Sequence, residues 1–160
     1  MEADYSWICD TCRQLIENID EGCVEWINQI GNNKKRIRRD LRLVHRQASP
    51  HRESVYECQF NTDHEFQKDR GTVSDRPLED FLGPNGLISL LAMIEFDNPA
   101  FSACVVEMIK RLHIPGYEHA RAHFDAAIRE GVIEPKMRQG FYSMGQIEAT
   151  LAFAAERGDE

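Results

Sequence analysis

Five cysteine and histidine residues in the first part of the chain are candidate metal ligands. Cys9 and Cys12 form a Cys-x-x-Cys pair, and His45, His51 and Cys58 follow across a basic stretch. A Cys-x-x-Cys turn places two thiolates on the same side of a tight loop, where they can occupy two corners of a zinc tetrahedron. We therefore expect one zinc ion bound by Cys9, Cys12, His45 and Cys58, with His51 as the substitute for Cys58.

The choice of the fourth ligand depends on two expected strands. Residues 39–45 alternate cations with Leu41, Leu43 and His45, and residues 55–60 alternate so that Tyr56, Cys58 and Phe60 share a face. If these two strands pair as a hairpin, His45 and Cys58 lie on the same sheet face. This hairpin favours Cys58, although the His-x5-His spacing keeps His51 open.

The rest of residues 1–60 also predicts a small β module. Trp7 and Ile8 lead into the cysteine turn, residues 23–27 are rich in β-formers, and residues 31–33 read as a turn. The segment holds too few apolar residues for a core of its own. Small modules of this kind are commonly stabilised by a metal ion.

This segment resembles zinc ribbons and zinc knuckles, and more loosely the uncharacterised bacterial and phage proteins that open with a knuckle followed by a Gly-x-Val-Glu-Trp strand. The resemblance spans residues 7–60 and rests on Cys9, Cys12, Gly22, Val24, Glu25, Trp26 and His45. It implies a zinc-binding β module. The chain departs from the ribbon pattern at Arg13, where ribbons usually have a glycine with a left-handed backbone. It also has no second Cys-x-x-Cys.

Other uses of the cysteines remain open. Two reduced structural cysteines are the main alternative, and a redox Cys-x-x-Cys lacks the surrounding βαβ pattern. Five cysteines is an odd number, and disulfides do not persist in a reducing compartment, which suits a cytoplasmic protein. We expect Cys23 and Cys104 to be spectators, with Cys104 in a helical core.

Positive charge is concentrated in one block of an acidic chain. The formal net charge is −8, yet residues 34–52 hold eight cations and a single anion, Asp40. Such a block indicates an anionic partner, either nucleic acid or an acidic protein, although a solvated strand face is the alternative. The candidate nucleic-acid-binding residues are Lys34, Lys35, Arg36, Arg38, Arg39, Arg42, Arg46 and Arg52.

The chain is expected to change character after residue 60. Residues 61–77 are polar and nearly free of large apolar side chains, which predicts a linker. Residues 78–160 then show helical periodicity, with helices near 87–94, 99–112, 117–129 and 144–155 and a small hairpin at 132–142. The expected organisation is a β module at 1–60, a linker at 61–77 and a helical module at 78–160.

The helical module resembles a winged helix in its layout. A helix ending at Leu112, the turn at residues 113–116, a second helix and the hairpin at 132–142 would form helix, turn, helix and wing. Its charges fit DNA poorly, because Glu118 and Asp125 would face the duplex. A plain helical core or a protein-docking surface is the alternative.

Catalytic patterns are weak in this sequence. His119 and His123 have the i, i+4 spacing of paired metal ligands, but Ala120 stands where zinc proteases need a glutamate. Glycine-rich phosphate loops and Gly-x-Ser-x-Gly are absent. An open zinc site with Glu25 or Glu57 as base is the remaining enzymatic possibility.

These observations predict an α+β chain in which a small zinc-stapled antiparallel β module is followed by a mainly helical, winged-helix-like module. We expect a non-enzymatic zinc-binding interaction or regulatory protein that contacts nucleic acid through residues 34–52. A protein-binding adaptor or inhibitor that uses the helical module is the alternative. The sequence lacks an apolar run of membrane-spanning length and a secretory signal, so we expect a soluble, cytoplasmic protein without membrane contact.

Overall fold

A computed structural model describes residues 5–46, 58–94 and 98–158. The chain has the predicted α+β composition, with antiparallel sheets in the first half and mostly helices in the second. It divides into two compact units. The N-terminal unit is Tyr5–His113, and the C-terminal unit contains Ile114–Glu160.

The N-terminal unit is built on a three-stranded antiparallel sheet. Before it, β1 (Trp7–Ile8) and β2 (Leu15–Ile16) pair across the cysteine turn, and the 3-10 helix η1 (Ile19–Glu21) leads into the sheet. The sheet has the order β4-β3-β5, and its strands are β3 (Gly22–Ile30), β4 (Arg36–His45) and β5 (Thr72–Pro77). The predicted strands at 23–27 and 39–45 are thereby confirmed.

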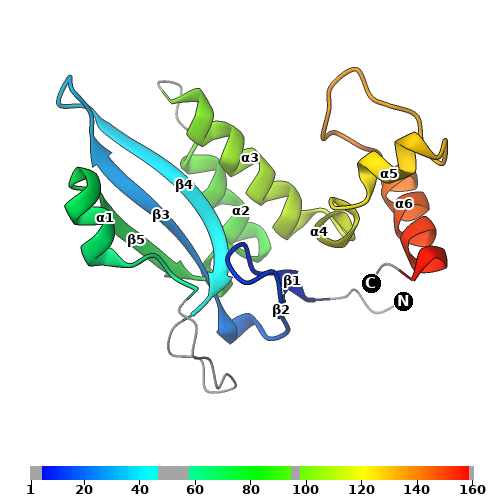
Figure 1. Cartoon of the computed structure of the whole chain (residues 1–160), viewed down its shortest axis with the longest axis horizontal. Helices are drawn as coiled ribbons and strands as arrows, with labels where there is room; N and C mark the ends of the chain where they lie inside the picture. The colour runs from blue at the N-terminus through cyan, green and yellow to red at the C-terminus, as the bar shows by residue number, and fades with distance from the viewer. Residues whose placement is uncertain (1–4, 47–57, 95–97, 159–160) are drawn as a thin grey trace. The chain divides into compact units, whose positions relative to one another are not determined.

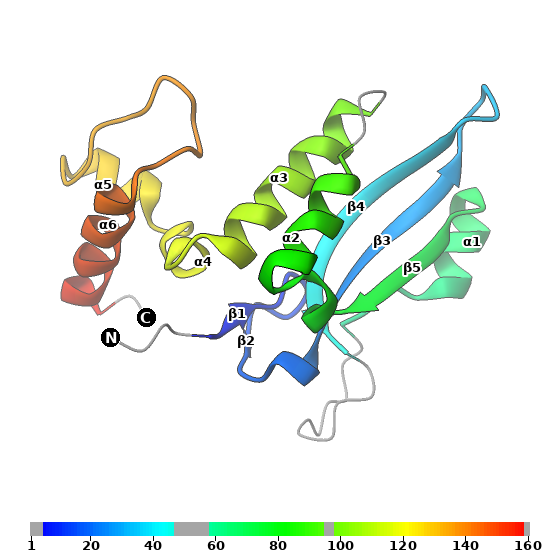
Figure 2. The same ribbon diagram turned by 180° about the vertical axis from the view of Figure 1, so that it is seen from behind.

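Helices cover both faces of this sheet (Figures 1 and 2). On one face lies α1 (Thr62–Asp69), capped by the Asn61 side chain, and on the other lie the 3-10 helix η2 (Leu78–Phe81), α2 (Gly83–Ala92) and α3 (Pro99–His113). Asn98 caps α3, because its side-chain oxygen accepts a hydrogen bond from the Phe101 amide at 3.3 Å. The core joins the cysteine turn to strand and helix side chains such as Val24, Leu43, Leu78 and Phe101.

The C-terminal unit is helical and has a small apolar core of its own. It consists of α4 (Tyr117–Ala120), α5 (Phe124–Arg129) and α6 (Met144–Arg157). The core gathers Tyr117, Phe124, Ile133 and Ile147, and Phe124 stacks on Tyr142 with ring centroids 4.1 Å apart. A full capping box between Ser143 and Gln146 begins α6, so local sequence signals define this helix.

The predicted linker at residues 61–77 is wrong. This segment forms α1 and β5, and β5 pairs with β3 from Cys23↔Pro77 to Asn28↔Thr72. The segment is polar because β5 is an edge strand and α1 is held by ion pairs: Arg39 Nη2 lies 2.8 Å from Asp69 and 3.3 Å from Glu65. The predicted division at 61–77 therefore falls inside one unit, and the boundary between the two units lies between residues 113 and 114 instead.

The predicted wing is also wrong. Residues 130–143, all of them described, contain turns and bends but no strand, since Ile133 is buried in the core and the segment includes Pro135 and Gly140. The expected helix at 117–129 is interrupted at residues 121–123. No winged helix is formed by these elements. Among the described residues, none of the helices combines the length and apolarity needed to cross a bilayer.

Candidate metal centre

The cysteine turn, the predicted knuckle, is closed by two backbone hydrogen bonds. The Cys9 amide donates to the Gln14 carbonyl and the Arg13 amide donates to the Cys9 carbonyl, each at 2.9 Å. Arg13 adopts φ 64°, the left-handed conformation for which ribbons usually supply glycine. Arg13 thus adopts the left-handed backbone conformation expected at this position of the turn.

The four predicted ligands come together. The donor atoms of Cys9, Cys12, His45 and Cys58 all lie within 4.8 Å of one another, close enough to bind a metal ion. Cys12 Sγ lies 3.4 Å and Cys58 Sγ 3.9 Å from His45 Nδ1. None of the five cysteines, all of which are described, forms a disulfide. His51 lies outside the described residues.

The His45 ring is oriented by its second nitrogen. Nε2 lies 3.0 Å from the Leu15 carbonyl oxygen. A carbonyl oxygen can only accept a hydrogen bond, so Nε2 carries the proton and donates it. The Nδ1 lone pair then faces the thiols of Cys12 and Cys58. Such a backbone partner on the other ring nitrogen is a usual feature of metal-binding histidines.

Asp10, between the two cysteines, attaches the turn to the rest of the unit. Its amide donates to the Leu43 carbonyl, and its carboxylate accepts from the Leu43 amide, each at 2.8 Å. The same carboxylate oxygen lies 2.8 Å from Arg111 Nη1, and Arg111 Nη2 donates to the Ile8 carbonyl at 3.0 Å. Arg111 is only 6% exposed. The knuckle, β4 and α3 are therefore parts of one packed structure.

A bulge in the sheet changes which cations face α1. The β3–β4 register shifts between Glu25 and Ile27, beside Asp40 with φ 56°. Because directly opposite residues share a face, Arg42 pairs with Glu25 and Arg39 with Ile27 on the same side of the sheet. Without the extra residue, Arg39 and Arg42 would point to opposite faces.

The predicted pairing of residues 39–45 with 55–60 is wrong. β4 pairs with β3, and residues 58–60 are not in a strand; residues 55–57 lie outside the described part. Cys58 is held by side chains instead. Its carbonyl accepts hydrogen bonds from Thr11 Oγ1 at 2.6 Å and Arg42 Nη2 at 3.1 Å. Cys58 therefore joins the cluster, although the hairpin from which it was predicted is not formed.

Glu25 is a buried carboxylate beside this segment. Its two oxygens accept from the Phe60 amide at 2.8 and 3.0 Å, and Oε1 accepts from Arg42 Nε and Nη2 at 3.1 and 3.0 Å. Burial raises the pKa of this carboxyl, while Arg42 and the Phe60 amide act in the opposite direction. With 0% exposure and both oxygens engaged, Glu25 is badly placed to act as a catalytic base. Glu57 lies outside the described residues.

The other two cysteines lie apart from the cluster. Cys23 is buried in β3, and burial raises the pKa of its thiol to about 12. Cys104, expected in the helical core, is exposed on α3. The expectation failed because residue 104 lies at the edge of the apolar stripe formed by Phe101, Val105 and Met108.

The basic block is divided by the fold. Lys34, Lys35 and Arg36 are exposed at the β3–β4 turn, and Arg46 is exposed at the far end of β4. The other cations have partners: Arg38 lies over the Phe101 ring, Arg39 pairs with Asp40, Glu65 and Asp69, and Arg42 pairs with Glu25. Arg52 lies outside the described residues.

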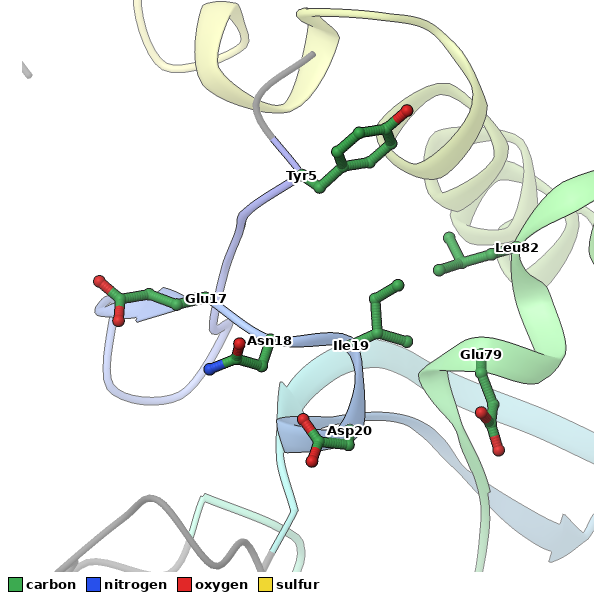
Figure 3. A pocket seen from close by; sticks show the side chains of 7 residues that line it. All are labelled: Tyr5, Glu17, Asn18, Ile19, Asp20, Glu79 and Leu82. Carbon is green, nitrogen blue, oxygen red and sulfur yellow. The ribbon is translucent and has the colours of Figure 1, made fainter. Parts of the chain in front are cut away.

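An open hollow lies at the other end of β3, by η1 and η2 (Figure 3). Its lining combines apolar side chains with carboxylates, and consists of Tyr5, Glu17, Asn18, Ile19, Asp20, Glu79 and Leu82. None of the four metal-donor residues lines it. The hollow therefore gives the cluster no substrate pocket.

Comparisons of the chain with protein-family models, with characterised proteins and with solved structures found no match. The resemblances to zinc ribbons and to winged helices are accordingly not confirmed by relatives. The structure is that of an α+β protein with a cluster of three cysteines and one histidine that could hold a metal ion.

Proposed function

We propose that this chain is a non-enzymatic zinc-binding protein in which the metal is structural. The convergence of Cys9, Cys12, His45 and Cys58 supports it most strongly. Three thiolates and one imidazole form a soft donor set suited to tetrahedral zinc. Four protein ligands also fill the zinc coordination shell, which leaves no position for a catalytic water.

The burial of the cluster supports a structural role. Cys9, Cys58 and His45 are 0%, 2% and 5% exposed. A buried polar cluster in the core of a unit stabilises the fold when its donors are satisfied by a metal ion. Asp10 attaches the turn to β4 and α3. Because of these bonds, a metal ion in the cluster would stabilise the whole N-terminal unit.

We further propose that the protein contacts nucleic acid through the β3–β4 turn. The contact residues would be Lys34, Lys35 and Arg36, with Arg38 and Arg46 contributing at the margins. Exposed cations at a turn that stands clear of α2 and α3 in both views can reach a phosphate backbone (Figures 1 and 2). Arg39 and Arg42 leave the proposed set because they are engaged by carboxylates within the protein.

Polyanion binding tests this part of the proposal. Replacing Lys34, Lys35 and Arg36 with Gln should weaken binding to DNA and RNA of any sequence and reduce the slope of log K against log salt by about 2 to 3. A control with Arg129, Lys136 and Arg138 replaced by Gln removes the same charge from the C-terminal unit and should bind like the wild type. Equal binding by the two triple variants would contradict the proposed contact.

A protein-binding adaptor remains the second candidate. Met137, Phe141 and Met144, in and beside the loop between α5 and α6, are 109%, 44% and 43% exposed. Exposed apolar side chains grouped in sequence suit a protein contact better than a phosphate backbone. Replacing these three residues with Ser should abolish capture of such a partner while leaving zinc content and polyanion binding unchanged.

A further inference from the structure

The fourth metal ligand differs from the other three in how it is supported. Cys9 and Cys12 lie in a hydrogen-bonded turn, and His45 ends a paired strand. Cys58 lies in no strand, so its position depends on side chains that reach residues 58–60.

Besides a hydrogen bond from Gln59 Nε2 to Asp75 at 2.9 Å, two groups of contacts hold these residues. Thr11 and Arg42 donate to the Cys58 carbonyl, while the Phe60 amide donates to both Glu25 oxygens. The Arg42 guanidinium also lies over the Phe60 ring, 3.5 Å from its centroid. Glu25 fixes Arg42 by accepting from Nε and Nη2. The side-chain hydrogen bonds of Glu25 therefore lead to the Cys58 segment, either directly or through Arg42.

We propose that Glu25 is a positioning residue for the metal centre: with Arg42, it holds Cys58 at the cluster as the fourth ligand. The inference rests on the proposed metal site. A fully buried carboxylate is unfavourable unless it is paired and hydrogen-bonded, and here its hydrogen-bond donors are Arg42 of β4 and the Phe60 amide. A glutamine would keep the shape, but its NH2 group would face a donor, the Phe60 amide or the Arg42 guanidinium.

Cobalt loading can separate positioning from general stability. Wild-type protein with Co²⁺ should show thiolate-to-metal charge transfer from three cysteines in a tetrahedral site. In Glu25→Gln, Cys58 should leave the shell, which lowers that absorption by about a third. Zinc transfer to a chelator should accelerate by about 10- to 100-fold.

Arg39→Gln is the matched control. Arg39 is on the same sheet face as Arg42, is equally exposed and is paired with carboxylates, but its partners lie on α1 and at Asp40 rather than on residues 58–60. This variant should lower stability while keeping the three-thiolate spectrum. Arg42→Lys provides a second test, because it keeps the positive charge but removes the hydrogen bond from Arg42 Nη2 to the Cys58 carbonyl. This variant should also lower the charge-transfer absorption, as Glu25→Gln does.

A double-mutant cycle identifies the residue through which Glu25 acts. In a Cys58→Ser background, adding Glu25→Gln should change zinc affinity little, because the ligand that Glu25 positions is already gone. Equal effects of Glu25→Gln in the two backgrounds would overturn the positioning role, as would a three-thiolate spectrum in Glu25→Gln and Arg42→Lys. Wild-type protein that takes up neither zinc nor cobalt would instead overturn the metal site and this inference with it.

Discussion

The N-terminal unit and the C-terminal unit are stabilised by different kinds of interaction. The N-terminal unit buries Glu25, His45 and Arg111 beside its apolar core and contains the cluster of four potential metal donors. The C-terminal unit packs around Phe124 and its neighbours, with buried Glu118 beside that core, and its last helix is capped by local side chains. Under the proposed function, metal binding therefore matters in the N-terminal unit, whereas apolar helix packing dominates in the C-terminal unit.

Removal of the metal should have the largest effect and should be confined to one unit. Structural zinc contributes on the order of 10 kcal/mol to small metal-dependent folds. On chelation we expect loss of amide protection throughout Tyr5–His113, including α2 and α3, because Asp10 and Arg111 join the knuckle to α3. Protection in α6 should persist. Loss of amide protection in both units together would contradict the claim that only the N-terminal unit depends on the metal.

Truncation of a core aromatic should give the reverse pattern. Phe124→Ala removes the ring that packs on both Tyr117 and Tyr142, and such changes cost about 3 to 5 kcal/mol. We expect the C-terminal unit to melt at lower temperature with zinc content unchanged. Phe81→Ala is the reciprocal variant, which should destabilise the N-terminal unit alone. Calorimetry measures the melting temperature of each unit, and metal analysis measures the zinc content. If the two units of either variant melted in one transition, they would not be independent.

Breaking the buried ion pair should be the next largest effect. Arg111→Met keeps much of the volume but leaves the Asp10 carboxylate without its cation, a loss of about 3 kcal/mol for a pair of this burial. Denaturant unfolding of the N-terminal unit should report it. The control is Arg76→Met, in an exposed pair with Asp80, which should change stability by less than about 1 kcal/mol. Equal losses of unfolding free energy in the two variants would show that Arg111 does not connect the cysteine turn to α3.

The smallest expected effect is a gain in stability. Arg13 has φ 64°, and a left-handed backbone is unfavourable by about 1 to 2 kcal/mol for a residue other than glycine. Arg13→Gly should therefore stabilise the zinc-loaded N-terminal unit by about 1 kcal/mol and leave the C-terminal unit unchanged. Thermal denaturation can measure this difference, and a destabilised variant would mean that the Arg13 side chain has a role of its own.

The four donors of the cluster could be predicted from residue types and spacing, whereas the side chains that support them could not. Cys-x-x-Cys is a local pattern, and beyond it the first 60 residues offer only Cys23, His45, His51 and Cys58 as further cysteine or histidine donors. Asp10 and Arg111 lie about a hundred residues apart in the chain, and neither looks unusual in its own segment. The Glu25–Arg42 pair carried a usable signal, because pairing residues 23–27 with 39–45 would have placed opposite charges across the strands.

The errors in the fold have a common physical origin. Residues 61–77 have little apolar character because β5 is an edge strand and α1 is fixed by Arg39, so their order comes from tertiary pairing. Residues 132–142 show the reverse error, in which a strand was predicted and none formed. Their sequence alternates like a strand, but Ile133 packs in the helical core instead. The local sequence pattern predicted the central strands and the capped helices correctly. It failed where long-range contacts determine the secondary structure.

The central claim is that Cys9, Cys12, His45 and Cys58 bind one zinc ion in a closed structural site. X-ray absorption spectroscopy of the purified protein, with its zinc content measured, tests it most directly. We predict one zinc per chain with three sulfur ligands at about 2.3 Å and one nitrogen ligand at about 2.0 Å. Protein that carries no zinc and cannot be loaded with it, or a spectrum with water in the coordination shell, would contradict the claim.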